Sequence, residues 1–138
     1  MNCYLDSSVV IRKLFGEKHP LAEWKKIKIG FSSRLLKLEC LRTIDRLRLK
    51  ASISNEETSE RMSGLHETLS HIALLPITER IFEKAEQSFP TPLASLDSIH
   101  LATALLWREK QGKGFLFATH DELLAMAAKA QGFEVIGL

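Results

Sequence analysis

The stretch SLDSIHLATAL, residues 95–105, carries the strongest structural signal in this chain. At helical spacing its leucine, isoleucine and alanine side chains cover almost the whole circumference, which predicts a helix buried in the core. Ser95 is a suitable N-cap residue, and Asp97 then falls in the first turn of this helix. A carboxylate beside an apolar core needs a compensating charge, a set of hydrogen bonds or a metal ion. The role of Asp97 therefore decides how the chain is interpreted.

Predicted strands and helices alternate on both sides of this stretch. Short apolar runs predict strands at residues 3–5, 27–31, 71–77, 115–118 and 133–136. Helical spacing predicts further helices at residues 8–15, 21–26, 34–49, 55–69, 79–88 and 123–131. In the helix at 34–49, Leu38, Leu41 and Leu49 are expected to form the apolar stripe, widened by Ile44 and Leu47. The alternation indicates an α/β fold of three layers, with a mainly parallel central sheet flanked by helices.

Size and composition indicate a cytoplasmic globular protein. The 138 residues are expected to form a single domain, 1–138, with a core of its own. No apolar run approaches the ~20 residues that a membrane-spanning helix needs, and the N-terminus lacks the basic and apolar regions of a signal peptide. The two cysteines form no close-spaced metal motif, which fits a reducing compartment. A net charge of +2 neither favours nor excludes nucleic acid as a partner.

The chain has only four aspartates, and three of them fall where a strand ends or the buried helix begins. Asp6 and Asp121 follow the first and fourth predicted strands, so both are expected in the crevice beyond the carboxyl ends of a parallel sheet. Asp97 and Glu39 are placed to reach the same crevice. Acidic side chains that meet without basic partners repel one another, and a hard divalent cation such as Mg²⁺ relieves that repulsion. Such an ion also activates water and stabilises a phosphate under attack.

Each aspartate also has a purely structural interpretation, which stays open from spacing alone. Asp97 can favour the positive end of its helix, an effect worth ~0.3–1 kcal/mol. Thr119 and Glu122 match a capping box, which makes Asp121 a first-turn acid. Asp6 can cap the first helix.

Glu39 and His100 have structural interpretations as well. Glu39 can pair with Arg42 three residues later on the same helix. His100 lies one turn after Asp97 on a buried helix, where a histidine is more often a hydrogen-bonded core residue than a ligand.

The acidic residues occur in an order that resembles the PIN-domain nucleases. The matching segments are Tyr4-Leu5-Asp6-Ser7-Ser8, then Leu38-Glu39, then residues 96–104, then Ala118-Thr119-His120-Asp121, and finally Gly132-Phe133-Glu134-Val135. The resemblance runs from residue 2 to 136, and no single motif carries it. A free-standing PIN domain of this length looks most like a VapC-type toxin of a toxin–antitoxin pair.

This resemblance implies an endoribonuclease that depends on Mg²⁺ or Mn²⁺ and hydrolyses RNA phosphodiester bonds. Its catalytic and metal-binding acids would be Asp6, Glu39, Asp97 and Asp121, with Asp6 and Asp97 as the most direct ligands. Ser7 and Thr119 stand where the family often has small hydroxyl residues that support the site. His120, beside Asp121, falls at a variable position and is given no role. The resemblance also implies a cognate antitoxin across the active groove and a homodimer.

Two other functions remain open at this point. One is a PIN nuclease that works in RNA processing, and the other is a PIN-like module that binds RNA or protein without catalysis. Retention of all four acids argues against the module, because a binding surface gains nothing from a repulsive cluster. Four basic residues are candidates for phosphate contacts: Arg12, Lys13, Lys37 and Arg42.

Overall fold

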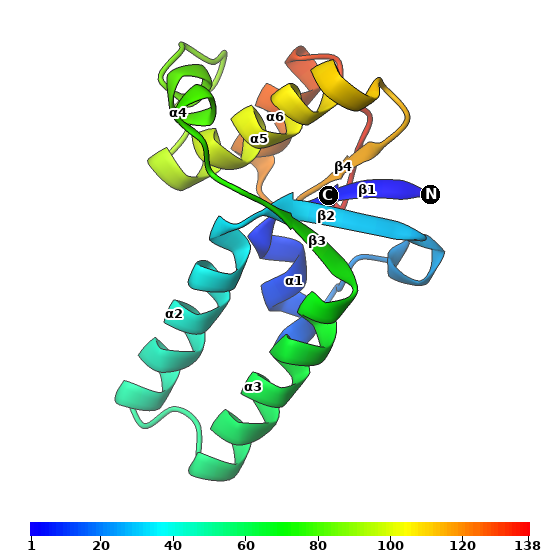
Figure 1. Cartoon of the computed structure of the whole chain (residues 1–138). Coiled ribbons are helices and arrows are strands. Elements are labelled where there is room, and N and C mark those ends of the chain that lie inside the picture. Colours follow the sequence, from blue (N-terminus) through cyan, green and yellow to red (C-terminus); the bar gives the residue numbers. More distant parts are fainter.

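Five parallel strands run through the centre of the molecule in the computed structural model, which describes residues 1–138 (Figure 1). Their order across the sheet is β3-β2-β1-β4-β5, and every neighbouring pair is parallel. The strands are β1 (Asn2–Leu5), β2 (Ile29–Ser33), β3 (Ile72–Leu75), β4 (Leu116–Ala118) and β5 (Val135–Ile136). The predicted parallel α/β sheet is therefore confirmed.

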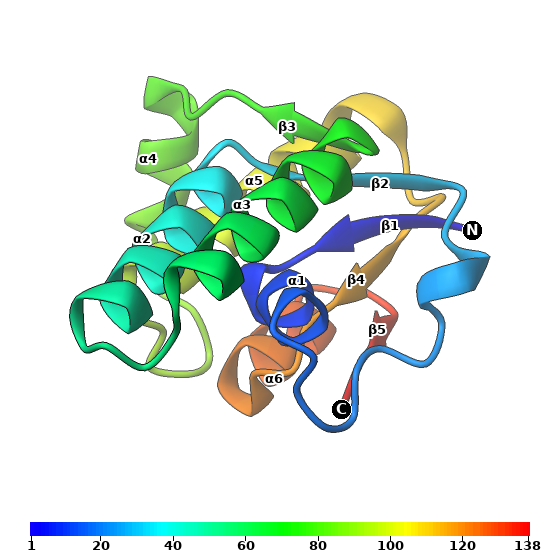
Figure 2. The same ribbon diagram turned by 90° about the horizontal axis from the view of Figure 1, so that it is seen from below.

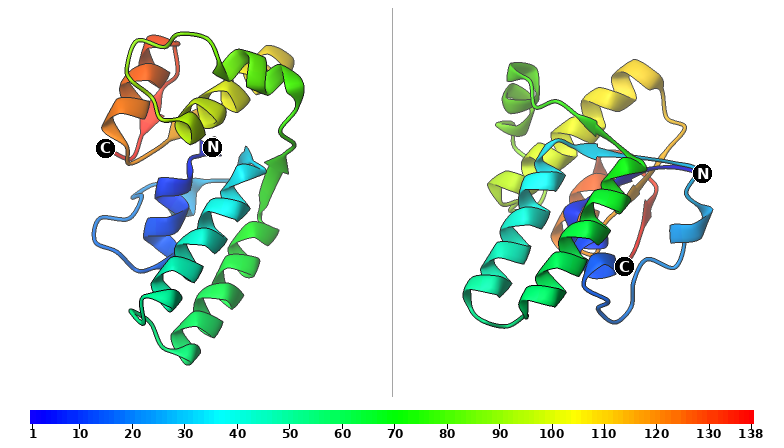
Figure 3. Two further views of the ribbon diagram at one scale, coloured as in Figure 1. Left: turned by 90° about the vertical axis from the view of Figure 1, so that its left-hand side faces the viewer. Right: turned by 60° about the horizontal axis from the view of Figure 1, so that its bottom comes forward.

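Helices cover both faces of this sheet (Figures 1 and 2). One layer contains α1 (Ser7–Leu14), α2 (Leu35–Leu49) and α3 (Asn55–Ser70). The other contains α4 (Glu79–Ala85), α5 (Ser95–Gln111) and α6 (Glu122–Ala130). A short 3-10 helix, η1 (Trp24–Lys26), precedes β2. Figure 3 shows α2 and α3 extending side by side well beyond the sheet. None of the helices combines the length and the apolar character needed to cross a bilayer.

Alternate residues of the central strand β1 pack into two separate hydrophobic cores, one on each face of the sheet. Cys3 and Leu5 pack into the core under α1, α2 and α3, while Tyr4 packs into the core under α5 and α6, because successive side chains of a strand point to opposite faces. The ring of Tyr4 stacks on Phe117 at 5.1 Å and meets the edge of Phe31 at 5.7 Å. Aromatic pairs of this kind add about 0.5–1.5 kcal/mol beyond area burial. Tyr4 is thus fixed firmly beside the end of β1.

The position predicted for β2 was wrong by two residues. The strand predicted at 27–31 lies at Ile29–Ser33, because the hydroxyls of Ser32 and Ser33 find buried hydrogen-bond partners in the carbonyl of Leu5 and the amide of Leu35. Polar residues that looked like the end of a strand therefore continue it.

The stripe predicted for α2 was right for Ile44, which is buried, and for Leu41, which packs against the core. It was wrong for Leu38 and Leu49, because the helix is rotated away from them. Its buried residues are Leu35, Leu36, Cys40 and Ile44. By contrast, Leu38 is 54% exposed and Leu49 is 72% exposed. This rotation turns Glu39, which neighbours the buried row, toward the end of the sheet.

The buried helix predicted at 95–105 is confirmed from His100 to Leu105, which are all buried. Its first turn differs, since Leu96 is 46% exposed. The N-terminal turn is left uncovered, and Asp97 within it is half-buried.

Candidate active site

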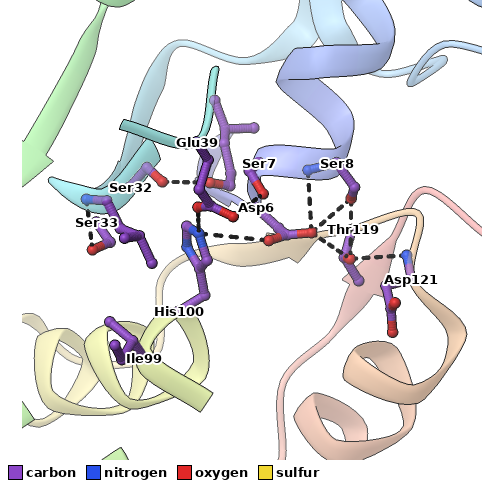
Figure 4. Close-up of polar contacts among 12 residues, drawn as sticks. Asp6, Ser7, Ser8, Ser32, Ser33, Glu39, Ile99, His100, Thr119 and Asp121 are labelled. Atoms are coloured by element: carbon purple, nitrogen blue, oxygen red, sulfur yellow. Dashed lines mark hydrogen bonds and ion pairs between the residues drawn. The ribbon is translucent and has the colours of Figure 1, made fainter. Parts of the chain in front are cut away.

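The site lies beyond the carboxyl ends of β1 and β4, which are neighbours in the sheet. Leu5 pairs with Ala118, and the amide of Asp6 continues the ladder by donating to the carbonyl of Ala118 at 3.0 Å. Residues that follow the two strands therefore start from adjacent positions. Figure 4 shows Asp6, Glu39, His100 and Thr119 gathered there from four different elements, with Asp121 beyond Thr119.

Asp6 is held through one carboxylate oxygen while the other stays free. Its side chain is 2% exposed, and it caps α1, as one structural interpretation predicted. Its Oδ2 atom accepts hydrogen bonds from the hydroxyls of Ser8 at 2.6 Å and Thr119 at 2.9 Å. Its Oδ1 atom is buried and has no hydrogen-bond partner. A buried carboxylate oxygen without a donor is costly, so this atom is the best candidate to meet a cation.

Glu39 points into the same site from α2. Its Oε2 atom accepts a hydrogen bond from Ser7 at 2.9 Å, and its Oε1 atom accepts one from Nε2 of His100 at 2.5 Å. The alternative pairing with Arg42 was wrong, because the Arg42 guanidinium lies 3.3 Å from Asp45 instead. Glu39 is therefore oriented by the site and not by its own helix.

Asp97 lies close enough to the other acids for their charges to shift its pKa. Burial raises the pKa of Asp97 to about 6, with further upward contributions from the charges of Asp6 and Asp121, whereas His100 opposes the shift. A helix N-terminus by itself favours the charged form. Burial and the neighbouring acids therefore outweigh any stabilisation of Asp97 by its helix. The expected N-cap was also wrong, because Ala94 occupies that position and no side chain caps α5.

Asp121 has a structural role that the sequence misplaced. It is itself the N-cap of α6, and its Oδ1 atom accepts a hydrogen bond from the amide of Leu124 at 2.7 Å. The capping box from Thr119 to Glu122 was wrong, since the Thr119 hydroxyl instead donates to Asp6 and accepts from the amide of Asp121. Asp121 is thus tied to Asp6 through Thr119.

His100 is a buried, hydrogen-bonded histidine, as its structural interpretation predicted. Its Nδ1 atom lies 2.7 Å from the hydroxyl of Tyr4, and its Nε2 atom lies 3.8 Å from Asp6 Oδ1 in addition to its bond with Glu39. Burial alone would lower the pKa of His100, but the Glu39 hydrogen bond and the charge of Asp6 raise it on balance.

The sequence missed how His100 and Tyr4 connect to the acids. A signal existed, because a tyrosine on a buried strand and a histidine on a buried helix both carry polar atoms that need partners.

Ser8 and Gly137 are two further residues that sequence reasoning missed. The Ser8 hydroxyl donates to Asp6 and accepts from the amide of His120 at 2.9 Å, which joins the first turn of α1 to the loop after β4. Gly137 has a φ of +104°, and a Cβ atom there would lie 2.6 Å from the carbonyl oxygen of Thr119. Only glycine permits this close approach of the C-terminal segment. The ring of His120 bonds the carbonyl of Gly137 at 2.5 Å, away from the carboxylates.

The donor set suits a hard cation, although the side chains do not form a ready-made cage. No three acidic, histidine or cysteine side chains converge as ligands of one ion. Mg²⁺ does not need such a cage, because it usually binds one or two carboxylates and keeps several waters. Two groups fit that requirement. They are the buried Oδ1 atom of Asp6, which has no hydrogen-bond partner, and the carboxylate of Asp97, whose pKa is raised by burial and by the neighbouring acids.

Most of the basic residues suggested for phosphate contacts already have partners. Arg12 lies 3.9 Å from Glu17, Lys13 stacks over the ring of Trp24 at 4.4 Å, and Arg42 pairs with Asp45. Lys37 makes no ion pair or side-chain hydrogen bond, and it lies on α2 two residues before Glu39. Of the four candidates, Lys37 is therefore the one whose charge is not already paired within the protein.

Two known proteins and one family model match most of this chain. The chain is 29% identical to Ribonuclease VapC46 of Mycobacterium tuberculosis over 136 residues, covering 96% of this chain and 95% of that relative. It is 28% identical to Ribonuclease VapC47 of the same species over 132 residues, covering 94% and 92% respectively. The family model described as the PIN domain matches residues 3–130. Since that match spans nearly the whole chain, this protein belongs to the PIN-domain family.

Proposed function

We propose that this protein is a metal-dependent endoribonuclease that hydrolyses RNA phosphodiester bonds. The observation that carries the proposal is the Oδ1 atom of Asp6, which is buried without a partner in a site where burial and the neighbouring acids raise the pKa of Asp97. Both features are expected where a divalent cation binds. The ribonuclease names of the two relatives support RNA as the substrate.

Asp6 and Asp97 would hold Mg²⁺ or Mn²⁺ most directly, with Glu39 and Asp121 at its edge. A bound ion of this kind lowers the pKa of water and neutralises charge that develops on a phosphate. The protein's own hydroxyls prepare the site. Ser8 and Thr119 fix Asp6 through Oδ2, which leaves Oδ1 available, and Ser7 fixes one oxygen of Glu39.

The proposal extends to a role as the toxin of a type II toxin–antitoxin system in the cytoplasm. Its partners would be the RNA substrate, a cognate antitoxin that covers the crevice, and a second copy of the chain in a homodimer. The similarity to two VapC ribonucleases over most of their length favours this role over RNA processing. A short gene for a small DNA-binding protein immediately upstream would support the toxin role, and its absence would favour processing.

The central experiment compares two aspartate variants in RNA cleavage with Mg²⁺ or Mn²⁺. Asp6→Asn should lose at least ~10²-fold in rate, because a positioned metal supplies several kcal/mol of transition-state stabilisation. EDTA should abolish cleavage by the wild type. Asp45→Asn is the matched control, since Asp45 is the one aspartate outside the site and pairs only with Arg42 and Arg48. Undiminished cleavage by folded Asp6→Asn would refute the assignment.

A further inference from the structure

A continuous path of hydrogen bonds runs from β2 through Tyr4 and His100 to the carboxylate of Glu39. Figure 4 shows its last link, between His100 and Glu39. The amide of Ser33 donates to the hydroxyl of Tyr4 at 3.2 Å, and that hydroxyl lies 2.7 Å from Nδ1 of His100. On the other side of the ring, Nε2 lies 2.5 Å from Oε1 of Glu39. Tyr4 and His100 are both completely buried. Water therefore does not compete for the bond between Tyr4 and His100, whereas the Glu39 side chain keeps 15% exposure.

The partner fixes the direction of the hydrogen bond to Glu39. An ionised carboxylate can only accept hydrogen bonds. Nε2 of His100 is therefore protonated and donates the hydrogen bond to Glu39. When the ring is neutral, the Tyr4 hydroxyl accepts from the amide of Ser33 and donates its own proton to Nδ1 of His100. Nε2 donates to Glu39 whether or not the ring carries a second proton.

The same ring nitrogen also faces Asp6, whose free Oδ1 atom lies 3.8 Å away. His100 belongs to α5 and Glu39 to α2, on opposite faces of the sheet, whereas Asp6 follows β1. The ring therefore sets where the Glu39 carboxylate stands relative to the free oxygen of Asp6.

We propose that His100, itself oriented by Tyr4, is a positioning residue that fixes the Glu39 carboxylate for the divalent cation. The inference rests on the proposed metal-dependent function. It goes beyond that function because it gives a defined task to a histidine and a tyrosine that touch neither the cation nor the RNA. Residues behind a metal's ligands commonly change metal affinity by 10–100-fold when they are mutated.

Two amide substitutions separate positioning from simple filling of the core. The amide nitrogen of glutamine can replace Nε2 of histidine, whereas an asparagine amide reaches only as far as Nδ1. His100→Gln should keep the Mn²⁺ affinity within a few-fold of the wild type, while His100→Asn should lose about 10–100-fold. Mn²⁺ binding is measured directly by electron paramagnetic resonance of the free ion, without RNA. Methionine has about the volume of glutamine but no donor, so a residue that only fills space would give the same Mn²⁺ affinity in His100→Met as in His100→Gln.

A double-mutant cycle tests whether His100 acts through Glu39. In a Glu39→Gln background, His100→Asn should cause little further loss of Mn²⁺ affinity, because the acceptor that it orients is already changed. Equal losses in both backgrounds would overturn the proposal. Where His100→Asn does not fold, Tyr4→Phe replaces it, since that change removes only the hydroxyl that orients the ring. Tyr4→Phe should lower the Mn²⁺ affinity several-fold in the wild-type background. In the Glu39→Gln background it should leave the affinity unchanged.

The outcomes for the two proposals are distinguishable. Wild-type protein that binds Mn²⁺ but cleaves no RNA would refute the nuclease function and leave the cycle to decide the role of His100. Cleavage that is abolished in Glu39→Gln but kept in folded His100→Asn, with unchanged Mn²⁺ affinity, would refute the positioning role alone. Wild-type protein that binds no Mn²⁺ would overturn both.

Discussion

The carboxylate of Glu39 accepts a 2.5 Å hydrogen bond from Nε2 of His100, a residue 61 positions further along the chain. Glu39 belongs to the helix layer on one face of the sheet and His100 to the layer on the other. These two side chains meet beyond the carboxyl ends of the strands. This bond therefore joins the two halves of the molecule at the proposed site.

Metal-free protein should tolerate the loss of one charge at the site. Asp97→Asn is expected to keep or raise the melting temperature without divalent cations, because it removes repulsion with Asp6 and Asp121. At a concentration of ~100 Kd, a cation that binds only the folded state should stabilise the wild type by ~2.7 kcal/mol. Most of that stabilisation should be absent in Asp97→Asn. Thermal melts with EDTA, Mg²⁺ and Mn²⁺ measure both effects.

If Asp97 instead serves only its helix, the same melts give the opposite pattern. Asp97→Asn would then be destabilised by ~0.3–1 kcal/mol, and cations would act equally on both proteins.

The stability of metal-free protein should also depend on pH through Asp97. Its pKa is about 6 in the folded state, above the ordinary value of 3.8, so the folded protein holds this proton more tightly than the unfolded chain. The resulting stabilisation is complete below about pH 4 and is lost as the pH rises through about 6. Denaturant unfolding at several pH values should show wild type losing stability relative to Asp97→Asn across this interval.

Asp45→Asn provides the control of opposite sign for this pH series. The hydrogen bond from Arg48 lowers the pKa of Asp45, so its stabilising effect is lost as the pH falls. A wild-type protein whose stability relative to Asp97→Asn rises between pH 4 and 6 would contradict the raised pKa of Asp97.

RNA binding should depend on Lys37 more than on the other cations considered. Lys37→Ala is expected to weaken binding to all RNA sequences. The slope of log K against log salt concentration should become shallower by ~0.7 for each phosphate that is no longer neutralised. Lys50→Ala is a suitable control, because Lys50 is an exposed lysine at the opposite end of the same helix. Titrations at several salt concentrations with the inactive Asp6→Asn protein provide the measurement. Identical salt slopes for the two lysine variants would place the RNA path elsewhere.

The sequence by itself determined the class of fold and the candidate acids. Alternating apolar strands and helical runs specified a parallel α/β sheet, because hydrophobic spacing depends only on local geometry. Asp6 and Asp121 could be placed at one edge for the same reason, since residues that follow parallel strands share that edge. The order of Asp6, Glu39, Asp97 and Asp121 carried the resemblance to the PIN family, which the match over residues 3–130 confirmed.

The tertiary structure alone decided which partner each polar group takes. Spacing along the helix allowed Glu39 to pair with Arg42. In the structure α2 is rotated so that the Glu39 carboxylate accepts hydrogen bonds from Ser7 and His100 instead. Spacing suggested Thr119 as a cap, yet its hydroxyl is used by Asp6 because β4 lies beside β1. Hydrogen bonds of this kind depend on which elements become neighbours in space. The choice between a helix neighbour and a distant residue is therefore made only when the sheet and its two helix layers come together.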